Sequence, residues 1–367
     1  MPPRSAVSPS PATDRVRRLR RRLLSWYDRH HRRLPWRPTP QSPPPDPYFT
    51  LVSEAMLQQT QVATVVPYFE RFVAAFPTVH DLAAADEQAV LRLWQGLGYY
   101  RRARHLHAAA KMIVERFDGK VPRAVDQLMQ LPGVGRYAAG AIASIAYGES
   151  APILDGNVAR VLARWFAIDE PIDETATRNR LWQLAERLVP KQRPGDFNQA
   201  LMELGALVCM PKSPQCLLCP VAPICDAHQA SRAAALPTRS PRRAPKSVTH
   251  HVAAIEKNGR YLFEQRGSDS LWARMWQLPT AESLNGQPLP NWIQQRFGLH
   301  TETTDPTHTF THQTTHRTIQ FTVHPLRVTA GRLKPNTATW RRLDQLDDLP
   351  LANPQRRIVA WLDDAES

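Results

Sequence analysis

The sequence predicts a mainly α-helical region followed by a smaller α+β domain. From Tyr48 to about Ala230, apolar residues recur at helical spacing in short segments that Pro and Gly interrupt. At about residue 231 the composition becomes basic and proline-containing, without periodicity, which is typical of a linker. Beyond it, apolar residues alternate with polar ones, the period of a β-strand. We therefore expect a helical domain over 15–230, a linker over 231–247 and a second domain over 248–367.

The N-terminal part of the chain is rich in proline, serine and arginine. Residues 1–14 predict a disordered tail because they offer little apolar surface to bury. Residues 15–33 carry nine arginines among apolar residues at helical spacing, which predicts a basic amphipathic helix. The arginines can simply form its solvated face, and a mitochondrial presequence has a similar pattern, so organellar targeting stays open. No function follows from the proline-rich loop over 37–47.

A glycine-rich turn lies within LPGVGRYAAGAIASIAYG, residues 131–148. Leu131-Pro132 ends one helix, Gly133 and Gly135 permit a tight turn, and a new helix begins near Arg136. Backbone N–H groups at such a helix start can hold a phosphate oxygen without distinguishing bases. The pattern predicts a helix-hairpin-helix, although any connection between two helices can use a glycine turn.

Two carboxylates stand in segments that predict helices. Asp155 precedes Gly156 and the run NVARVLAR, which is the position of a helix N-cap. Glu54 lies in TLVSEAMLQQTQVATVV, where it has only apolar or uncharged neighbours. It is therefore either an edge residue or a buried acid with a raised pKa.

All four cysteines of the chain fall within 17 residues, in the pattern C-x6-C-x2-C-x5-C: Cys209, Cys216, Cys219 and Cys225. Zinc bound by four cysteines usually uses two C-x2-C pairs. The single pair and the wider loops here suit an iron–sulfur cluster at least as well. Two disulfides are the remaining alternative, and a reducing compartment disfavours them.

The C-terminal part reads as strands with one helix. HVAAIEKNGRYLFEQR predicts a hairpin with Asn258-Gly259 as a type I′ turn. THRTIQFTVHPLRV predicts a strand, and residues 289–299 predict a helix. His308, His312 and His316 are spaced by four, but their Thr-rich surroundings favour strand or loop over a helical metal site.

Charge and hydropathy narrow the function. The formal net charge of +14 favours a polyanionic partner, of which nucleic acid is the commonest, although a basic proteome gives the same signal. No apolar run is long enough to span a membrane and no secretory h-region is present, so we expect a cytoplasmic protein without a membrane partner.

The order of these features resembles the endonuclease III superfamily of DNA glycosylases. More narrowly, SEAMLQQTQVATVVPYFERF, LWQGLGYYRRARHLH and ILDGNVARVLAR are similar to the A/G-specific adenine DNA glycosylases, closely over 15–230 and more loosely over 248–367. The resemblance implies a helix-hairpin-helix glycosylase domain of two helical lobes, a [4Fe-4S] cluster on the loop 209–225, and a Nudix-like domain that recognises 8-oxoguanine. That domain lacks the acidic Nudix box, so hydrolysis of pyrophosphates is not expected.

The implied activity is monofunctional removal, in base excision repair, of adenine mispaired with 8-oxoguanine or guanine in duplex DNA. Glu54 would protonate the adenine and ionised Asp155 would stabilise the cationic sugar. Tyr137 and Asn157 would support Asp155 and the sugar. Bifunctional relatives have a lysine after GVGR, whose amine forms a Schiff base and cuts the strand. A phenol cannot form that imine, so Tyr137 predicts no efficient lyase activity.

The resemblance also implies roles in binding, and we expect a monomer to perform them. Gln59 and Tyr99 would enter the base stack, Leu57 would pack near the extruded base, and Gly133 and Gly135 would hold the backbone. The adenine pocket would be lined by Arg32, Leu34, Trp36, Arg37 and Gln199. The lesion would meet Phe310, Thr311 and His312, with Thr311 where the family has a serine. Two alternatives remain: an endonuclease III-like pyrimidine glycosylase/lyase, and a DNA-binding scaffold without catalysis.

Overall fold

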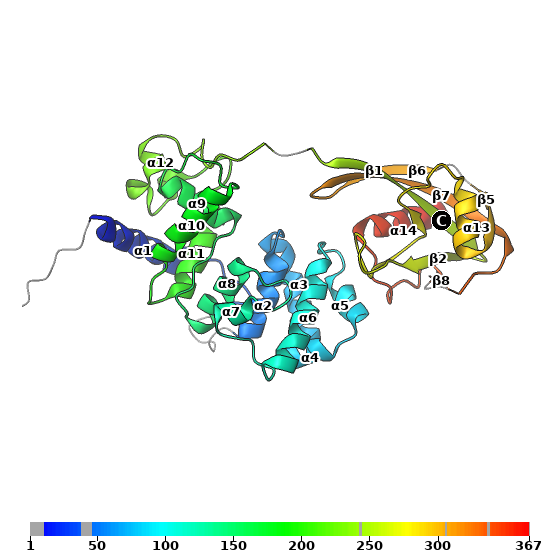
Figure 1. The fold of residues 1–367 in the computed structure, drawn as a ribbon, viewed down its shortest axis with the longest axis horizontal. Coiled ribbons are helices and arrows are strands. Elements are labelled where there is room, and N and C mark those ends of the chain that lie inside the picture. The colour runs from blue at the N-terminus through cyan, green and yellow to red at the C-terminus, as the bar shows by residue number, and fades with distance from the viewer. Residues whose placement is uncertain (1–10, 38–45, 242–243, 305–306, 336–337, 367) are drawn as a thin grey trace, which may run out of the picture. The chain divides into compact units, whose positions relative to one another are not determined.

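The computed structural model describes residues 11–37, 46–241, 244–304, 307–335 and 338–366. The expected disordered tail over 1–10, most of the proline-rich loop and two residues of the linker lie outside them. The chain divides into two compact units: Met1–Ala83 with Ala108–Pro241, and Ala84–His107 with Arg242–Ser367. Figure 1 shows helices in the first and the sheet in the second, which confirms the predicted fold class.

The first unit is built from helices and ends in the cysteine loop. Its elements are α1 (Pro11–His30), α2 (Pro47–Leu57), α3 (Val62–Ala75), α4 (Val79–Ala84), the second half of α6 (Arg101–Arg116), α7 (Val125–Leu128), α8 (Arg136–Tyr147), α9 (Gly156–Trp165), α10 (Thr175–Leu188), α11 (Pro194–Leu207), η1 (Cys216–Leu218), η2 (Ala222–Ile224) and α12 (Asp226–Gln229). None of the described helices is both long and apolar enough to cross a membrane.

Helix α1 begins at Pro11, so residues 11–14 are helical and the expectation that they are disordered was wrong. Its apolar face is buried as predicted, with Leu19 and Leu23 fully covered. One of its arginines joins α1 to α10: the Arg20 guanidinium donates to the carbonyls of Leu188 and Val189 at the end of α10. Such a cation satisfies carbonyls that a helix C-terminus leaves without partners.

Helix α11 is the element around which the first unit is organised. It packs against α1, α8 and α9. The approach to α9 is close because Gly205 has no side chain, and a Cβ added there would lie 2.8 Å from the Cβ of Asn157. Helix α11 therefore holds its side chains directly against the start of α9 and the turn before α8.

The second unit contains one mixed sheet, in which β3, β2, β1, β7 and β5 are neighbours, β4 pairs with β1, β6 with β7 and β8 with β2. Strands β1 and β7 run parallel and the other pairs are antiparallel. The strands are β1 (Lys246–Lys257), β2 (Arg260–Gln265), β3 (Trp276–Gln277), β4 (Thr280–Ala281), β5 (Leu299–Thr303), β6 (His308–Gln313), β7 (Arg317–Gly331) and β8 (Ala338–Arg341).

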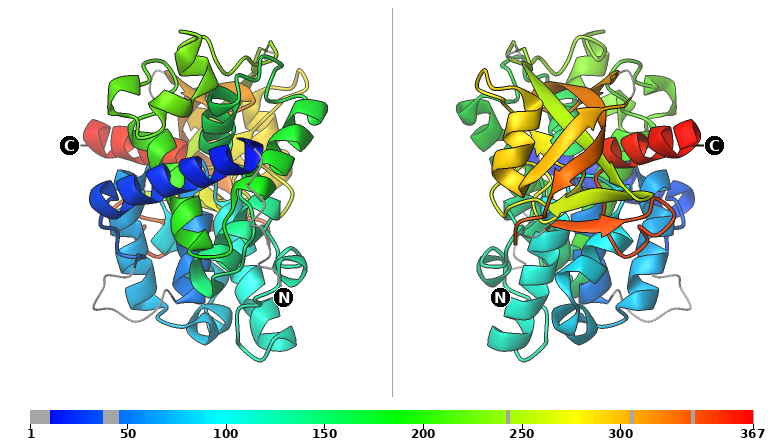
Figure 2. Two further views of the ribbon diagram at one scale, coloured as in Figure 1. Left: turned by 90° about the vertical axis from the view of Figure 1, so that its left-hand side faces the viewer. Right: turned by 90° about the vertical axis from the view of Figure 1, so that its right-hand side faces the viewer.

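One helix covers each face of this sheet. Ala253 and Ile255 of β1 pack with α13 (Leu289–Phe297), whereas Val252 and Ala254 share a cluster with Ile358 of α14 (Asn353–Glu366). Alternate residues of a strand face opposite sides, so both faces of β1 are buried. Figure 2 shows these two helices on either side of the strands.

The expected turn and helix of the second unit are confirmed, but β1 already begins at Lys246, within the expected linker. Asn258 and Gly259 both have positive φ, as a type I′ turn requires, and the predicted helix ends at Gly298 in the left-handed conformation. The unit also includes α5 (Glu87–Trp94), whose Gln88 accepts a hydrogen bond from the indole of Trp276 at 3.1 Å. Among the described residues no three metal-ligating side chains are grouped to hold an ion, including the three spaced histidines.

Candidate active site

A cavity of about 140 Å³ in the first unit brings the predicted chemistry to one place. It is bordered by α2, α8, α9, α11 and the segment that follows α1. Ten of the predicted residues line it: Glu54, Asp155, Tyr137, Asn157, Arg32, Leu34, Trp36, Arg37, Gln199 and Leu57. Two carboxylates that are 101 positions apart in the sequence thus share one enclosed space.

Glu54 is a buried acid, which decides between the two possibilities that its sequence left open. It lies in the last two turns of α2 and is 5% exposed, and its Oε2 has no hydrogen-bond partner. Burial raises the pKa of Glu54 to about 7, while the Tyr137 hydroxyl acts in the opposite direction and Asp155 adds to the rise. At neutral pH an acid of this kind is present in both its protonated and its ionised form, so it can deliver a proton and later accept one.

Asp155 has the helix-capping role that its position suggested. It is the N-cap of α9 and accepts a hydrogen bond from the Val158 N–H at 2.6 Å. Asn157 Nδ2 donates to its other oxygen at 3.2 Å. Burial raises the pKa of Asp155, and these hydrogen bonds oppose the rise because they favour the carboxylate.

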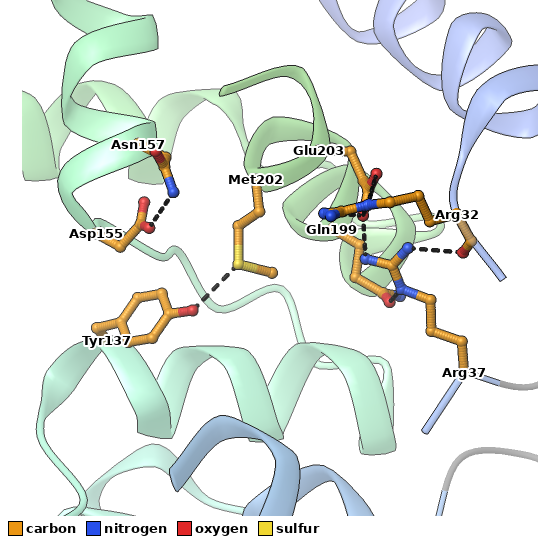
Figure 3. A network of polar contacts seen from close by, with 8 residues as sticks. All are labelled: Arg32, Arg37, Tyr137, Asp155, Asn157, Gln199, Met202 and Glu203. Atoms are coloured by element: carbon orange, nitrogen blue, oxygen red, sulfur yellow. Dashed lines mark hydrogen bonds and ion pairs between the residues drawn. The ribbon is translucent and has the colours of Figure 1, made fainter. Parts of the chain in front are cut away.

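Tyr137 lies in the first turn of α8, at the exit of the glycine turn. Burial raises the pKa of its phenol well above the usual value, so the hydroxyl stays protonated. That hydroxyl lies 3.1 Å from Met202 Sδ. Figure 3 shows Tyr137, Asp155 and Asn157 together at one side of the cavity.

The opposite side carries a set of charged and polar groups that we name the guanidinium cluster: Arg32, Arg37, Gln199 and Glu203. Glu203 accepts from both arginines and Arg37 donates to Gln199. Sequence analysis missed Glu203, although FNQALMELGALV carries the same signal as the segment around Glu54. In that segment it is the lone carboxylate, one helical turn after Gln199.

The residues expected to hold DNA lie outside the cavity, apart from Leu57. Gln59 and Tyr99 are exposed and have φ of 60° and 49°, a strained conformation for residues with side chains. Tyr99 belongs to the second unit. Gly133 has φ of 78° in the turn, and Gly135 is the N-cap of α8. Both glycines are exposed, so the start of α8 is open to an anion.

The three residues expected to meet the lesion lie on strand β6, not in a loop, because β6 pairs with β7 along its length. Phe310 is buried and stacks on Phe321 with ring centroids 5.1 Å apart. Thr311 points to the other side of the strand and is exposed, and His312 is half-buried near Trp272. Thr311 is therefore the member of this set that is open to a partner.

All four cysteines line one small cavity of about 20 Å³, and all are free thiols in this structure. Their side chains are not grouped tightly enough, as they stand, to hold an ion. A set of four thiols around one space suits iron–sulfur or zinc. Arg164 Nη1 donates to Cys209 Sγ at 3.2 Å.

Two buried arginines of α9 join the active-site cavity to the cysteine loop. The Nη2 of Arg160 donates to Asn157 Oδ1 and its Nε to the Cys209 carbonyl, both at 2.8 Å. Arg164, one turn later, donates to the carbonyls of Met210 and Pro211. Sequence analysis missed both, since arginines in so basic a chain look like surface charge.

Comparisons with known proteins agree with the helical and sheet-containing parts of the chain. Residues 52–187 match the HhH-GPD superfamily of base excision DNA repair proteins, and residues 251–361 match the NUDIX domain. The adenine DNA glycosylase of Rattus norvegicus is 51% identical over 218 residues, which cover 58% of this chain and 42% of the rat protein. The chain thus corresponds to less than half of that relative.

Two further comparisons cover their counterparts almost completely. The adenine DNA glycosylase of Buchnera aphidicola subsp. Schizaphis graminum is 31% identical over 346 residues, 92% of this chain and 96% of that protein. A solved structure of a trapped covalent intermediate of endonuclease III with DNA is 25% identical with a TM-score of 0.50, over 59% of this chain and 97% of that one. The likeness to that structure therefore spans nearly all of the endonuclease III chain.

Proposed function

Since the chain belongs to the adenine DNA glycosylase family, we propose that it removes adenine from duplex DNA by hydrolysing the bond between base and deoxyribose. One observation carries the proposal. The buried carboxyl of Glu54, whose Oε2 has no hydrogen-bond partner and whose pKa is about 7, lines the same cavity as Asp155. Two carboxyl groups whose environments differ are the arrangement that glycoside hydrolysis uses.

The mechanism assigns one task to each group. The adenine leaves the duplex and enters the cavity, as enzymes that act on a base require. Glu54 delivers its proton to N7, which makes the base a better leaving group. Asp155, whose ionised form the N–H groups of Val158 and Asn157 favour, faces the positive charge that develops on the sugar. Glu54, now ionised, accepts a proton from the water that completes hydrolysis.

Tyr137 makes this a hydrolase without strand cleavage. The phenol stands where an amine would be needed to form a Schiff base, and its raised pKa keeps it neutral. It supports the Glu54 carboxyl and presents no nucleophile to the sugar. We propose adenine opposite 8-oxoguanine or guanine as the substrate, with the exposed Thr311 of the second unit available to the opposing base.

The expected result is base loss without strand cleavage. On a duplex with adenine opposite 8-oxoguanine, product should appear only after alkali treatment, and borohydride should trap no covalent complex. A duplex with cytosine opposite 8-oxoguanine serves as control and should stay intact. Cutting without alkali, or activity on damaged pyrimidines, would favour the endonuclease III-like alternative. Binding of the duplex without any loss of base would favour the other alternative, a DNA-binding scaffold without catalysis.

We also propose that Cys209, Cys216, Cys219 and Cys225 hold a [4Fe-4S] cluster. Support comes from the four free thiols around one cavity, with a single C-x2-C pair and wider flanking loops. The bound cluster would cross-link the loop that follows α11. Arg160 and Arg164 would then fix the start of α9, and with it Asp155 and Asn157, against that rigid loop.

Purified protein should therefore be brown and contain iron and acid-labile sulfide in equal amounts. Replacing Cys216 with serine should reduce the iron content of the protein. The control is serine in place of Lys212, an exposed residue of the same loop, which should leave the iron content unchanged. A colourless protein that contains zinc would contradict the cluster and would leave the proposed glycosylase activity standing.

A further inference from the structure

The buried Glu203 carboxylate joins the polar groups of the guanidinium cluster. Its side chain is 1% exposed and lies on α11, one helical turn after Gln199. Oε1 accepts from Arg32 Nη2 at 2.9 Å and lies 2.8 Å from Arg37 Nη2, and Oε2 accepts from Arg32 Nε at 2.9 Å. Figure 3 shows the carboxylate between the two guanidinium groups. The arginines therefore cannot reorient without losing charge-assisted hydrogen bonds.

The same contacts determine the orientation of the Gln199 amide. Arg37 Nε donates to Gln199 Oε1 at 2.8 Å, and Arg37 is itself held by Glu203 and by the Arg32 carbonyl. A guanidinium can only donate, so the amide oxygen must face Arg37. The amide NH₂ of Gln199 is thereby directed away from Arg37, as a donor on the wall of the cavity.

The hydrogen-bond donors on this wall of the cavity suit a base edge that presents acceptors. Adenine presents acceptor ring nitrogens beside its amino donor, whereas hypoxanthine, of the same size, has a carbonyl oxygen beside a ring N–H. The Arg32 Nη1 has no recorded partner within the described chain, so it is a second available donor. Donors facing a ring N–H would leave buried groups unpaired, which is how sites reject an analogue strongly.

We propose that Glu203 is a positioning residue for base specificity: it directs the donors of Arg32 and Gln199 toward the acceptor nitrogens of an extruded adenine. The inference rests on the proposed glycosylase function and deepens it. Glu203 acts through its neighbours, and its loss changes which base is accepted as well as how fast any base is removed.

Glu203 also balances the charge beside the general acid. The cluster holds two guanidinium groups and one carboxylate, and Glu54 lines the same cavity. Burial is the main cause of the raised pKa of Glu54, and the charge of Arg37 already acts against it. Without the Glu203 carboxylate the positive charge is no longer offset, so the pKa of Glu54 falls and its proton is lost at lower pH.

The test compares Glu203→Gln with the unchanged chain on duplexes that place adenine or hypoxanthine opposite 8-oxoguanine. Single-turnover excision of adenine should slow by ~10–100-fold, the size expected for lost hydrogen bonds to charged groups. The ratio of the adenine rate to the hypoxanthine rate should fall, and the alkaline limb of the pH profile should move to lower pH. Glu186→Gln, at an exposed position of α10, is the matched control and should change none of these.

Equal slowing on both bases with an unmoved pH profile would overturn the proposal, because a purely structural role predicts that result. If the Gln variant does not fold, Glu203→Asp keeps the charge and shortens the reach to Arg32. The Asp variant should lower the ratio of the adenine rate to the hypoxanthine rate without moving the pH profile. A ratio equal to that of the unchanged chain would refute the proposal. Failure of the unchanged chain to remove adenine would instead refute the proposed function.

Discussion

Replacing Glu54 with Gln should lower the single-turnover rate of adenine excision by ~10²–10⁴-fold, the contribution of a positioned general acid. Glutamine has the same shape but no proton to donate to the base. Affinity for an adenine·8-oxoguanine duplex should change little, because the carboxyl is buried in the cavity and the expected DNA contacts lie outside it. The measurements are a single-turnover time course and a binding titration at fixed salt.

The pH profile supplies the control that the rate alone cannot. Burial raises the pKa of Glu54 to about 7, so its protonated form prevails below that pH and the parental rate should fall tenfold per unit above it. The residual rate of the Gln variant should lack this limb. A Gln variant that retains the parental rate, or the parental limb, would remove Glu54 from the mechanism.

The raised pKa of Glu54 also makes the free energy of unfolding depend on pH. The folded state binds the Glu54 proton more tightly than the unfolded state, so this stabilising contribution is complete at low pH and is lost as pH rises through about 7. Gln has no such dependence. The difference in unfolding free energy should therefore move in favour of the Gln variant by about 3 kcal/mol between roughly pH 4 and pH 8.

Much of the fold could be predicted because local patterns agree with tertiary packing. The period of two in the C-terminal part, the turn at Asn258 and the glycine turn at Gly133 each reflect a backbone requirement that the sequence states directly. The grouping of α5 with the second unit could not be predicted, since it depends on contacts such as Gln88 with Trp276.

Site residues could be predicted from the sequence where a residue of that type would lower stability unless it had a function. A lone acid such as Glu54 in an apolar helix costs stability, so it attracts notice. Glu203 gives the same signal more weakly, and its purpose appears only when Arg32 and Arg37 are placed around it. Arg160 was hidden because burial, not composition, distinguishes it from the many surface arginines of this chain.

The burial of Phe310 could not be predicted from the sequence. The family resemblance implied that Phe310 meets the lesion, but the alternation of β6 directs it into the core against Phe321. The sequence establishes the order of residues along a strand, and the face that each residue occupies depends on the register with β7.

Replacing Asp155 with Asn should lower the excision rate by ~10²–10³-fold, the effect of removing one preorganised electrostatic group. Asparagine caps a helix as well as aspartate, so α9 should keep its start and the unfolding free energy should change little. The loss would therefore report on charge opposite the sugar and not on the capping role.

The pH profile of the Asp155 variant separates it from that of the Glu54 variant. After burial, the charge of Asp155 contributes to the raised pKa of Glu54, so neutralising it should move the alkaline limb to lower pH without abolishing it. Because both groups act on one nucleoside in one cavity, the double variant should be little slower than the slower single variant. Strictly multiplicative losses, or an unmoved limb, would show that the two carboxyls act on separate events.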